Sequence, residues 1–407
     1  MQVVIAIAAL IGLALLSASA ARRSMNNRLT GMAIAGLWGA AIVGAVLGAD
    51  AVGLVDDRTR ELATPLVMAT LGWVGMMIGL QFRREVVARV PALVWRLVAI
   101  DAAVTLAVWC PIAAVLAWRA FDGAPFDAVI GAAAALGTGM LGWSSETRTI
   151  RSGGTAGPTP GEVTIRASGA VSSLFAVIVF GLALFGVIGV RRFLLEPSAL
   201  GTGLVGAGAG LVLAILGGAM LGRMSLTLAG RSRGDQLVAF LGCLTLVAGI
   251  AAKFGVSAML SATAVGILIG NSRGFGAREF ERFLLRAEIA TATLLGLLVG
   301  IGATIHVSAP ELILAAAVVA WRIAVKPIVM RIAAGPAHRD REMMLGAIRP
   351  HPIALAIALG LTIRIDETVA SGVCTVVIMA AVVSDLVAWA LARVAPRPSA
   401  PEIRGPA

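Results

Sequence analysis

Runs of apolar residues long enough to cross a bilayer recur along the whole chain, and they limit its fold more than any other feature. Hydrophobic residues make up 59% of the 407 residues and charged residues only 14%, against about 25% charged in soluble domains. Only helices and closed barrels satisfy their backbone in lipid, and a spanning helix needs about 20 residues. Thirteen runs have this character, at residues 2–21, 31–54, 62–82, 92–118, 125–145, 166–188, 203–222, 235–253, 256–272, 284–305, 310–334, 345–364 and 368–394. The sequence therefore predicts an all-α polytopic membrane protein with about thirteen transmembrane helices.

The placement of basic residues predicts the orientation of these helices. Arginine and lysine concentrate in short loops on the cytoplasmic side of a membrane. With the N-terminus outside, basic residues in the inward loops outnumber those in the outward loops by about three to one. The stretch Ala18-Ser19-Ala20 resembles a signal-peptide cleavage site, but no basic region precedes it, so we expect the first span to be retained. We predict an outside N-terminus and a cytoplasmic C-terminus, in a membrane of the bacterial inner type.

Composition also limits the partners and the chemistry. The net charge of +11 invites a nucleic-acid role, but the arginines are spread over the loops and form no basic domain, so the lipid bilayer is the expected partner. Cys110, Cys243 and Cys374 lie in or near apolar spans without CxxC spacing, which favours buried small side chains over a disulfide or metal site. No HExxH, nucleophile elbow or P-loop is present, so we predict no enzyme activity, no cofactor and no metal site.

Several stretches resemble motifs of one transporter family. They are residues 48–57 with 71–80, residues 254–262 leading into 265–271, residues 288–305, and Lys326-Pro327. Together they are similar to the monovalent cation:proton antiporter superfamily, the sodium/hydrogen exchanger-like membrane proteins. The resemblance extends over most of residues 30–394.

This resemblance implies an inverted repeat in which two broken helices cross near the middle of the membrane. Residues 136–140 (Leu-Gly-Thr-Gly-Met) and 349–352 (Arg-Pro-His-Pro) lie in the two spans that fit the crossing helices, and the prolines should interrupt the second. It also implies dimerisation or scaffold helices at 1–90 and 203–305, transport-core helices at 91–190 and 310–394, and a homodimer. The Pro-rich tail, 395–407, is predicted to be disordered and cytoplasmic.

The chain departs from the family at its ion site. The family's acidic pair falls where this chain has Ser172-Ser173. Hydroxyl groups can coordinate a cation, but they do not titrate near neutral pH. The chain therefore resembles an atypical member that lacks the acidic pair.

Depth along the predicted spans indicates where replacement groups lie. Asp101, Asp385, Lys326 and Arg322 fall close to one layer, at about 1.5 Å per helical residue. A charge at this depth needs a partner, and either Asp101 or Asp385 can pair with Lys326. We hypothesise that these four residues line the ion pathway together with Ser172, Ser173, Thr138 and His351. The alternative is a static ion pair that holds two core helices together.

The function predicted from these features is secondary active transport by alternating access. The resemblance favours exchange of a small monovalent cation, Na⁺ or K⁺, for protons. Two alternatives remain: an atypical carrier of anions or organic solutes, and a membrane scaffold that keeps the fold without transport. Among the other polar side chains, Glu146 and Glu288 are predicted to be loop or pairing charges. Trp118, Trp143 and Trp389, near span ends, are predicted to belong to an interfacial aromatic belt.

Overall fold

The computed structural model describes Gly12 and residues 37–48, 62–143, 160–195, 200–228, 233–272, 290–304, 307–335 and 341–394. Within these ranges the chain is helical and has no strand beyond an isolated β-bridge. Five helices there are long and apolar enough to cross a membrane: Thr64–Gln81, Ala92–Ala120, Val163–Val187, Ala309–Ala334 and Glu367–Leu391. The predicted all-α polytopic architecture is confirmed. Thirteen spans stay a prediction, since residues 2–21 lie outside the described part apart from Gly12, as does the whole tail 395–407.

Helix bounds follow the predicted spans closely at most positions. The helices are α3 (Leu37–Leu47), α5 (Thr64–Gln81), α6 (Arg84–Val87), α7 (Ala92–Val104), α8 (Cys110–Ala120), α9 (Phe126–Gly139), α10 (Pro160–Leu195), α11 (Leu200–Leu228), α12 (Arg233–Phe254), α13 (Ala258–Gly270), Ala290–Ile301, α15 (Ala309–Ala320), α16 (Lys326–Ala334), α17 (Arg341–Ile348), α18 (Ile353–Leu361) and α19 (Glu367–Val394). The largest difference is α10, which begins at Pro160 and not near residue 166. A proline fits the first turn of a helix, where its missing N–H is not needed.

Two of the long spans contain a π-helical segment that ends two residues before a proline. Segment η1 (Thr105–Trp109) joins α7 to α8 ahead of Pro111, and η4 (Trp321–Val325) joins α15 to α16 ahead of Pro327. Proline lacks the N–H that continues an α-helix, and local π turns accommodate it within a membrane span. The same device thus occurs once in each half of the predicted repeat.

The two predicted broken helices are interrupted as the sequence indicates. Helix α9 ends at Gly139, and the chain continues without helix to Trp143. The second interruption lies between α17 and α18, over the residues around Pro350 and Pro352. Trp143 and Pro350 form an antiparallel β-bridge. The two interruptions therefore meet, which is the crossing that the sequence predicted.

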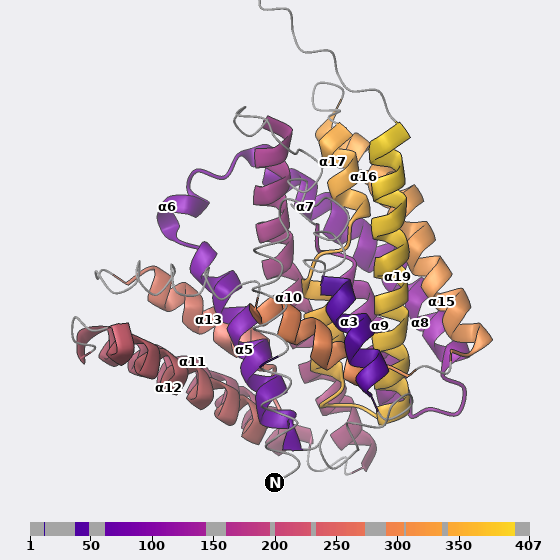
Figure 1. Ribbon diagram of the computed structural model, residues 1–407. Helices are drawn as coiled ribbons and strands as arrows, with labels where there is room; N and C mark the ends of the chain where they lie inside the picture. Colours follow the sequence, from indigo (N-terminus) through magenta and orange to yellow (C-terminus); the bar gives the residue numbers. More distant parts are fainter. Residues whose placement is uncertain are drawn as a thin grey trace, which may run out of the picture.

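The helices fall into two groups in space (Figure 1). Helices α11 and α12 lie side by side, with α13 and α5 next to them, while α15, α16 and α19 lie on the opposite side of α10. Gly75 allows α5 and α13 to touch, because a Cβ there would sit 2.2 Å from the Met259 carbonyl oxygen. Small residues let membrane helices approach in this way. The assignment of these groups as scaffold and transport core stays a prediction.

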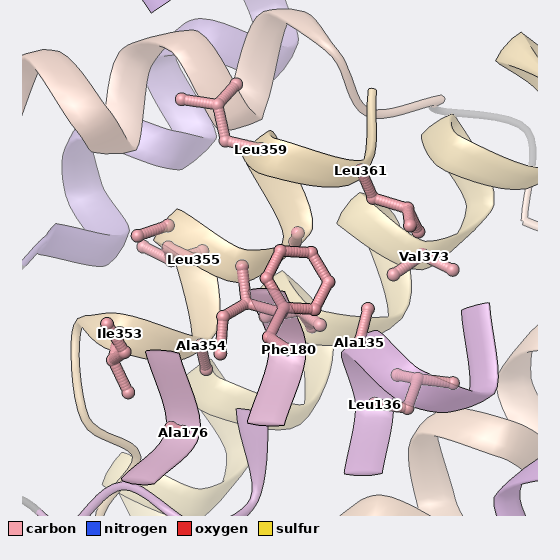
Figure 2. Packing of buried hydrophobic residues seen from close by; sticks show 14 of the residues in the cluster. Ala135, Leu136, Ala176, Phe180, Ile353, Ala354, Leu355, Leu359, Leu361 and Val373 are labelled. Carbon is pink, nitrogen blue, oxygen red and sulfur yellow. The ribbon is translucent and has the colours of Figure 1, made fainter. Parts of the chain in front are cut away.

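Helices α9, α10, α18 and α19 enclose a dense apolar core (Figure 2). Ala135 and Leu136 of α9 and Phe180 of α10 pack against Leu355 of α18 and Val373 of α19. Every side chain of α18 is buried. This core extends to the two interruptions, since Met140, Leu141 and Ile353 belong to it.

Candidate functional site

A buried ion pair joins the two spans that contain π segments. Lys326 Nζ lies 2.5 Å from Asp101 Oδ2, and both residues are 2% exposed. Trp143 Nε1 donates to the same carboxylate oxygen over 2.8 Å. The Lys326 ammonium also lies 5.9 Å from the centre of the Trp143 ring, within cation–π range. Asp101, Lys326 and Trp143 thus form one closed polar cluster.

Local structure explains how Lys326 reaches Asp101. Asp101 lies on α7 one turn before η1, and Lys326 is the first residue of α16 after η4. The aromatic rings of the two π segments are in contact, since the centroids of Trp109 and Trp321 are 5.3 Å apart. The two spans therefore lie against each other along the stretch that carries the ion pair.

Arg322 binds both helix interruptions at once. Its Nη2 donates to the Gly139 carbonyl oxygen at 2.9 Å, and its Nη1 donates to the Arg349 carbonyl oxygen at 3.2 Å. These oxygens lie at the C-terminal ends of α9 and α17, where helix dipoles place partial negative charge. The guanidinium, 2% exposed, therefore supplies the positive charge that two C-terminal helix ends favour.

Asp385 pairs with a different cation from the one bound by Asp101. Arg349 Nε lies 3.8 Å from Asp385 Oδ1, and Trp38 Nε1 donates to Asp385 Oδ2 at 2.5 Å. The side chain of Asp385 is 33% exposed. Of the two partners that the sequence allowed for Lys326, the structure thus selects Asp101. Asp385 instead connects α3 and α19 to the second interruption.

The hydroxyl groups of the predicted layer come from α10 and from the last turn of α9. Ser172 and Ser173 of α10 both donate to the Gly169 carbonyl oxygen, at 3.1 and 2.7 Å. Ser173 Oγ also lies 3.4 Å from His351 Nδ1. Thr138 donates to the Ala134 carbonyl oxygen within α9. The serine pair therefore contacts the second interruption through His351.

Apolar side chains seal the ion pair in this conformation. Leu97, Trp143, Ile165 and Met330 form a buried cluster beside it. Among the described residues, no group of three or more His, Cys, Asp or Glu side chains is arranged to hold a metal ion. The Asp101–Lys326 pair is therefore closed to solvent and lies beside the crossing of the broken helices.

One sequence prediction about this region is wrong. Trp143 was predicted as an interfacial belt residue because it lies at the end of an apolar run, but it is 1% exposed and hydrogen-bonded to Asp101. Helix α9 ends at Gly139, six residues before the end of the apolar run 125–145, and the chain turns back into the core at this point. The contact of Trp38 with Asp385 is not predictable from the sequence, because nothing in the apolar span of Trp38 marks it as a hydrogen-bond partner. Glu146 and Glu288 lie outside the described residues.

Comparison with known proteins supports the fold. No protein-family model matches the chain, and no curated protein sequence matches it. A solved structure does, that of the sodium proton antiporter MjNhaP1 from Methanocaldococcus jannaschii at pH 8, with a TM-score of 0.63 and 15% sequence identity, over 97% of this chain and 99% of the antiporter. This chain has the antiporter's fold. The similar structure is a membrane transporter and not an enzyme, which agrees with an integral membrane protein built from apolar helices.

Proposed function

We propose that the protein is a secondary active transporter that exchanges a monovalent cation, Na⁺ or K⁺, for protons by alternating access. The observation that carries the proposal is the Asp101–Lys326 ion pair, buried where the two broken helices cross. Ionisable residues at membrane depth are costly and are functional by default. The likeness to a sodium proton antiporter supports the same class of function.

The Asp101–Lys326 pair has the chemistry that exchange at one site requires. A carboxylate can bind either a lysine ammonium or a free cation. Loss of the Lys326 proton frees the charge of Asp101 for Na⁺ or K⁺, and rebinding of the proton expels the cation. The two ions then compete for one group, which couples their movements.

The charge of the surrounding layer favours a cation over an anion. Among the described residues, the layer holds three buried basic side chains, Arg322, Lys326 and Arg349, together with the buried Asp101 and the partly exposed Asp385. The C-terminal ends of α9 and α17, which Arg322 caps, add about −0.5 charge each. The layer is therefore close to neutral when Lys326 is protonated. Release of that proton makes it negative and able to hold one monovalent cation.

Ser172, Ser173 and Thr138 supply oxygen atoms near this layer. Each hydroxyl proton is already donated to a backbone carbonyl, so the lone pairs of the hydroxyl oxygen are left to act as acceptors. We propose that these oxygens and the His351 ring line the cation pathway while Asp101 provides the charge. In this arrangement the serines of α10 contribute oxygen ligands, and the Asp101–Lys326 pair on α7 and α16 binds the proton.

Burial of the Asp101–Lys326 pair does not by itself distinguish a transporter from a membrane scaffold. A transporter in a closed conformation and a scaffold with a static ion pair both bury Asp101 and Lys326. They differ in what happens when the pair is removed, because only a transporter loses ion movement. The anion-carrier alternative rests on the excess of buried basic side chains and predicts movement of anions with no dependence on Na⁺ or K⁺.

Transport in liposomes separates these possibilities. The purified protein is reconstituted with a trapped pH dye, and Na⁺, K⁺ or Li⁺ is added outside. We expect a cation-dependent pH change in the wild type, its loss in Asp101→Asn and Asp385→Asn, and its retention in Asp122→Asn, an exposed loop carboxylate. No cation response beside a working exchanger would refute the proposal, and an anion gradient in the same vesicles would test the alternative carrier.

Removing one partner of a buried pair costs about 3–5 kcal/mol and can impair folding. The double variant Asp101→Asn with Lys326→Gln keeps the charge balance and controls for this. If it folds, as judged by a symmetrical size-exclusion peak, and still exchanges cations at the wild-type rate, the pair is static and the transport role is excluded.

The setting of this transporter is also a proposal. We propose a homodimer in a bacterial inner membrane, with the N-terminus outside and the C-terminus cytoplasmic, because the family resemblance and the basic loops both favour it. Chemical crosslinking in native membranes tests the dimer. Protease access to a C-terminal tag in inside-out vesicles tests the orientation.

A further inference from the structure

We propose that Trp143 is a positioning residue that sets how tightly the Asp101–Lys326 pair holds its proton, and that it links this pair to the crossing of the broken helices. The inference rests on the proposed proton exchange. Trp143 is the residue through which the first interruption touches both the ion pair and the second interruption.

The indole acts on both members of the pair in chemically different ways. Its N–H donates to Asp101 Oδ2, the oxygen that also faces Lys326. A hydrogen bond to an ionised acceptor stabilises its charge. The Trp143 N–H therefore weakens the attraction of the Asp101 carboxylate for the proton on Lys326. The ring face, 5.9 Å from the ammonium, stabilises the protonated lysine. Removing only the N–H should therefore make the pair hold its proton to higher pH.

Backbone contacts fix the indole in place. Trp143 forms the β-bridge to Pro350. Its carbonyl lies so close to Gly169 of α10 that a Cβ on this glycine would come within 2.7 Å of the oxygen. Arg322 holds the neighbouring ends of α9 and α17 with one guanidinium. Any movement of the crossing therefore moves the Trp143 N–H relative to Asp101, and this couples helix position to proton release.

The charged groups around Asp101 remain the same when Trp143 is changed. Lys326 on α16 and Arg322 on η4 act electrostatically on Asp101. Helix α10, which also packs against α7, carries Arg166 near its N-terminal end, and α7 itself carries Arg96, which donates to the Ala333 carbonyl oxygen. A change in the pH dependence of Trp143 variants therefore reports the lost contacts of the indole.

The test compares two tryptophan-to-phenylalanine variants. Trp143→Phe keeps an aromatic face near Lys326 and removes the N–H. Trp321→Phe is the matched control, since Trp321 is also buried but its Nε1 has no hydrogen-bond partner in the described structure. We expect half-maximal cation exchange to move about one to two pH units higher in Trp143→Phe, with the maximal rate recovered at alkaline pH, and no shift in Trp321→Phe. Mere structural damage would lower the rate at every pH.

A second readout does not depend on transport. The unfolding temperature of the detergent-solubilised protein is measured against pH, and we expect its alkaline transition to shift upward in Trp143→Phe alone. Profiles of Trp143→Phe that overlay those of the wild type in both measurements would overturn the role of Trp143. If the wild type exchanges no cations, the proposed function fails, while the unfolding profiles still decide whether Trp143 controls the proton of the pair.

Discussion

The Arg322 guanidinium gives the most direct test of how the crossing is held together. Its two terminal nitrogens each serve a different carbonyl oxygen, those of Gly139 and Arg349. Arg322→Lys keeps the charge but leaves a single nitrogen, which cannot reproduce the fork. One hydrogen bond from a charged donor, worth about 1.5–3 kcal/mol, is then lost. A buried carbonyl is also left without its partner, so we expect a loss of about 2–4 kcal/mol in unfolding free energy.

Arg364 provides a matched control on another helix end. Its Nη2 alone donates to the carbonyl oxygens of Ala251 and Val256, at 3.3 and 3.0 Å. A lysine ammonium has three donors on one nitrogen and can serve both. Arg364→Lys should therefore cost less than about 1 kcal/mol.

Equilibrium unfolding in mixed detergent micelles, followed by circular dichroism, measures both variants against the wild type. Reconstitution of Arg322→Lys then shows whether a loosened crossing also slows cation exchange. Equal stabilities for the two variants would refute the idea that Arg322 clamps the interruptions. An Arg322→Lys protein that is more stable than the wild type would also refute it. The free energy needed to bury the guanidinium would then exceed the stabilisation from its two hydrogen bonds.

Three further substitutions test the packing and the second ion pair. Gly75→Ala places a methyl group 2.2 Å from the Met259 carbonyl oxygen and should lower the unfolding temperature by several degrees, whereas Gly206→Ala, with nothing within 4 Å, should leave it unchanged or higher. Asp385→Glu keeps the charge facing Arg349 and should retain part of the exchange that Asp385→Asn loses, as measured by the vesicle pH signal. Ser308→Ala breaks the capping box of α15 and should cost about 1 kcal/mol in the micelle unfolding assay.

The fold was largely predictable because membrane helices leave a strong signal in the sequence. The span predicted at 310–334 is the continuous helix Ala309–Ala334, and the span at 368–394 is α19, Glu367–Val394. The interruption at Pro350 and Pro352 was also predictable, since proline lacks the backbone donor that a helix needs. Apolar length alone did not locate the end of α9, because residues 140–143 are apolar or small and still leave the helix.

The pairing within the site was less predictable than its depth. Depth placed Asp101, Asp385, Lys326 and Arg322 in one layer, and the structure brings Asp101 to Lys326 and leaves Asp385 to Arg349. Depth does not determine the direction of a side chain around its helix. The π segments η1 and η4 insert an extra residue per turn, so the 3.6-residue period cannot be carried from one side of them to the other. The partner of Lys326 therefore had to come from the structure.

The need of a buried lysine for a carboxylate partner connects the serine pair with the ion pair. Lys326, 2% exposed in an apolar core, cannot remain charged there without a carboxylate. With Ser172 and Ser173 on α10, that carboxylate comes from α7, the span that shares a π segment and a following proline with the span of Lys326. The ion pair thus lies between two equivalent spans of the predicted repeat, directly beside the crossing of the broken helices. If alternating access moves these halves against each other, the Asp101–Lys326 distance changes with every cycle, and proton binding is coupled to the motion without an acidic group at position 172 or 173.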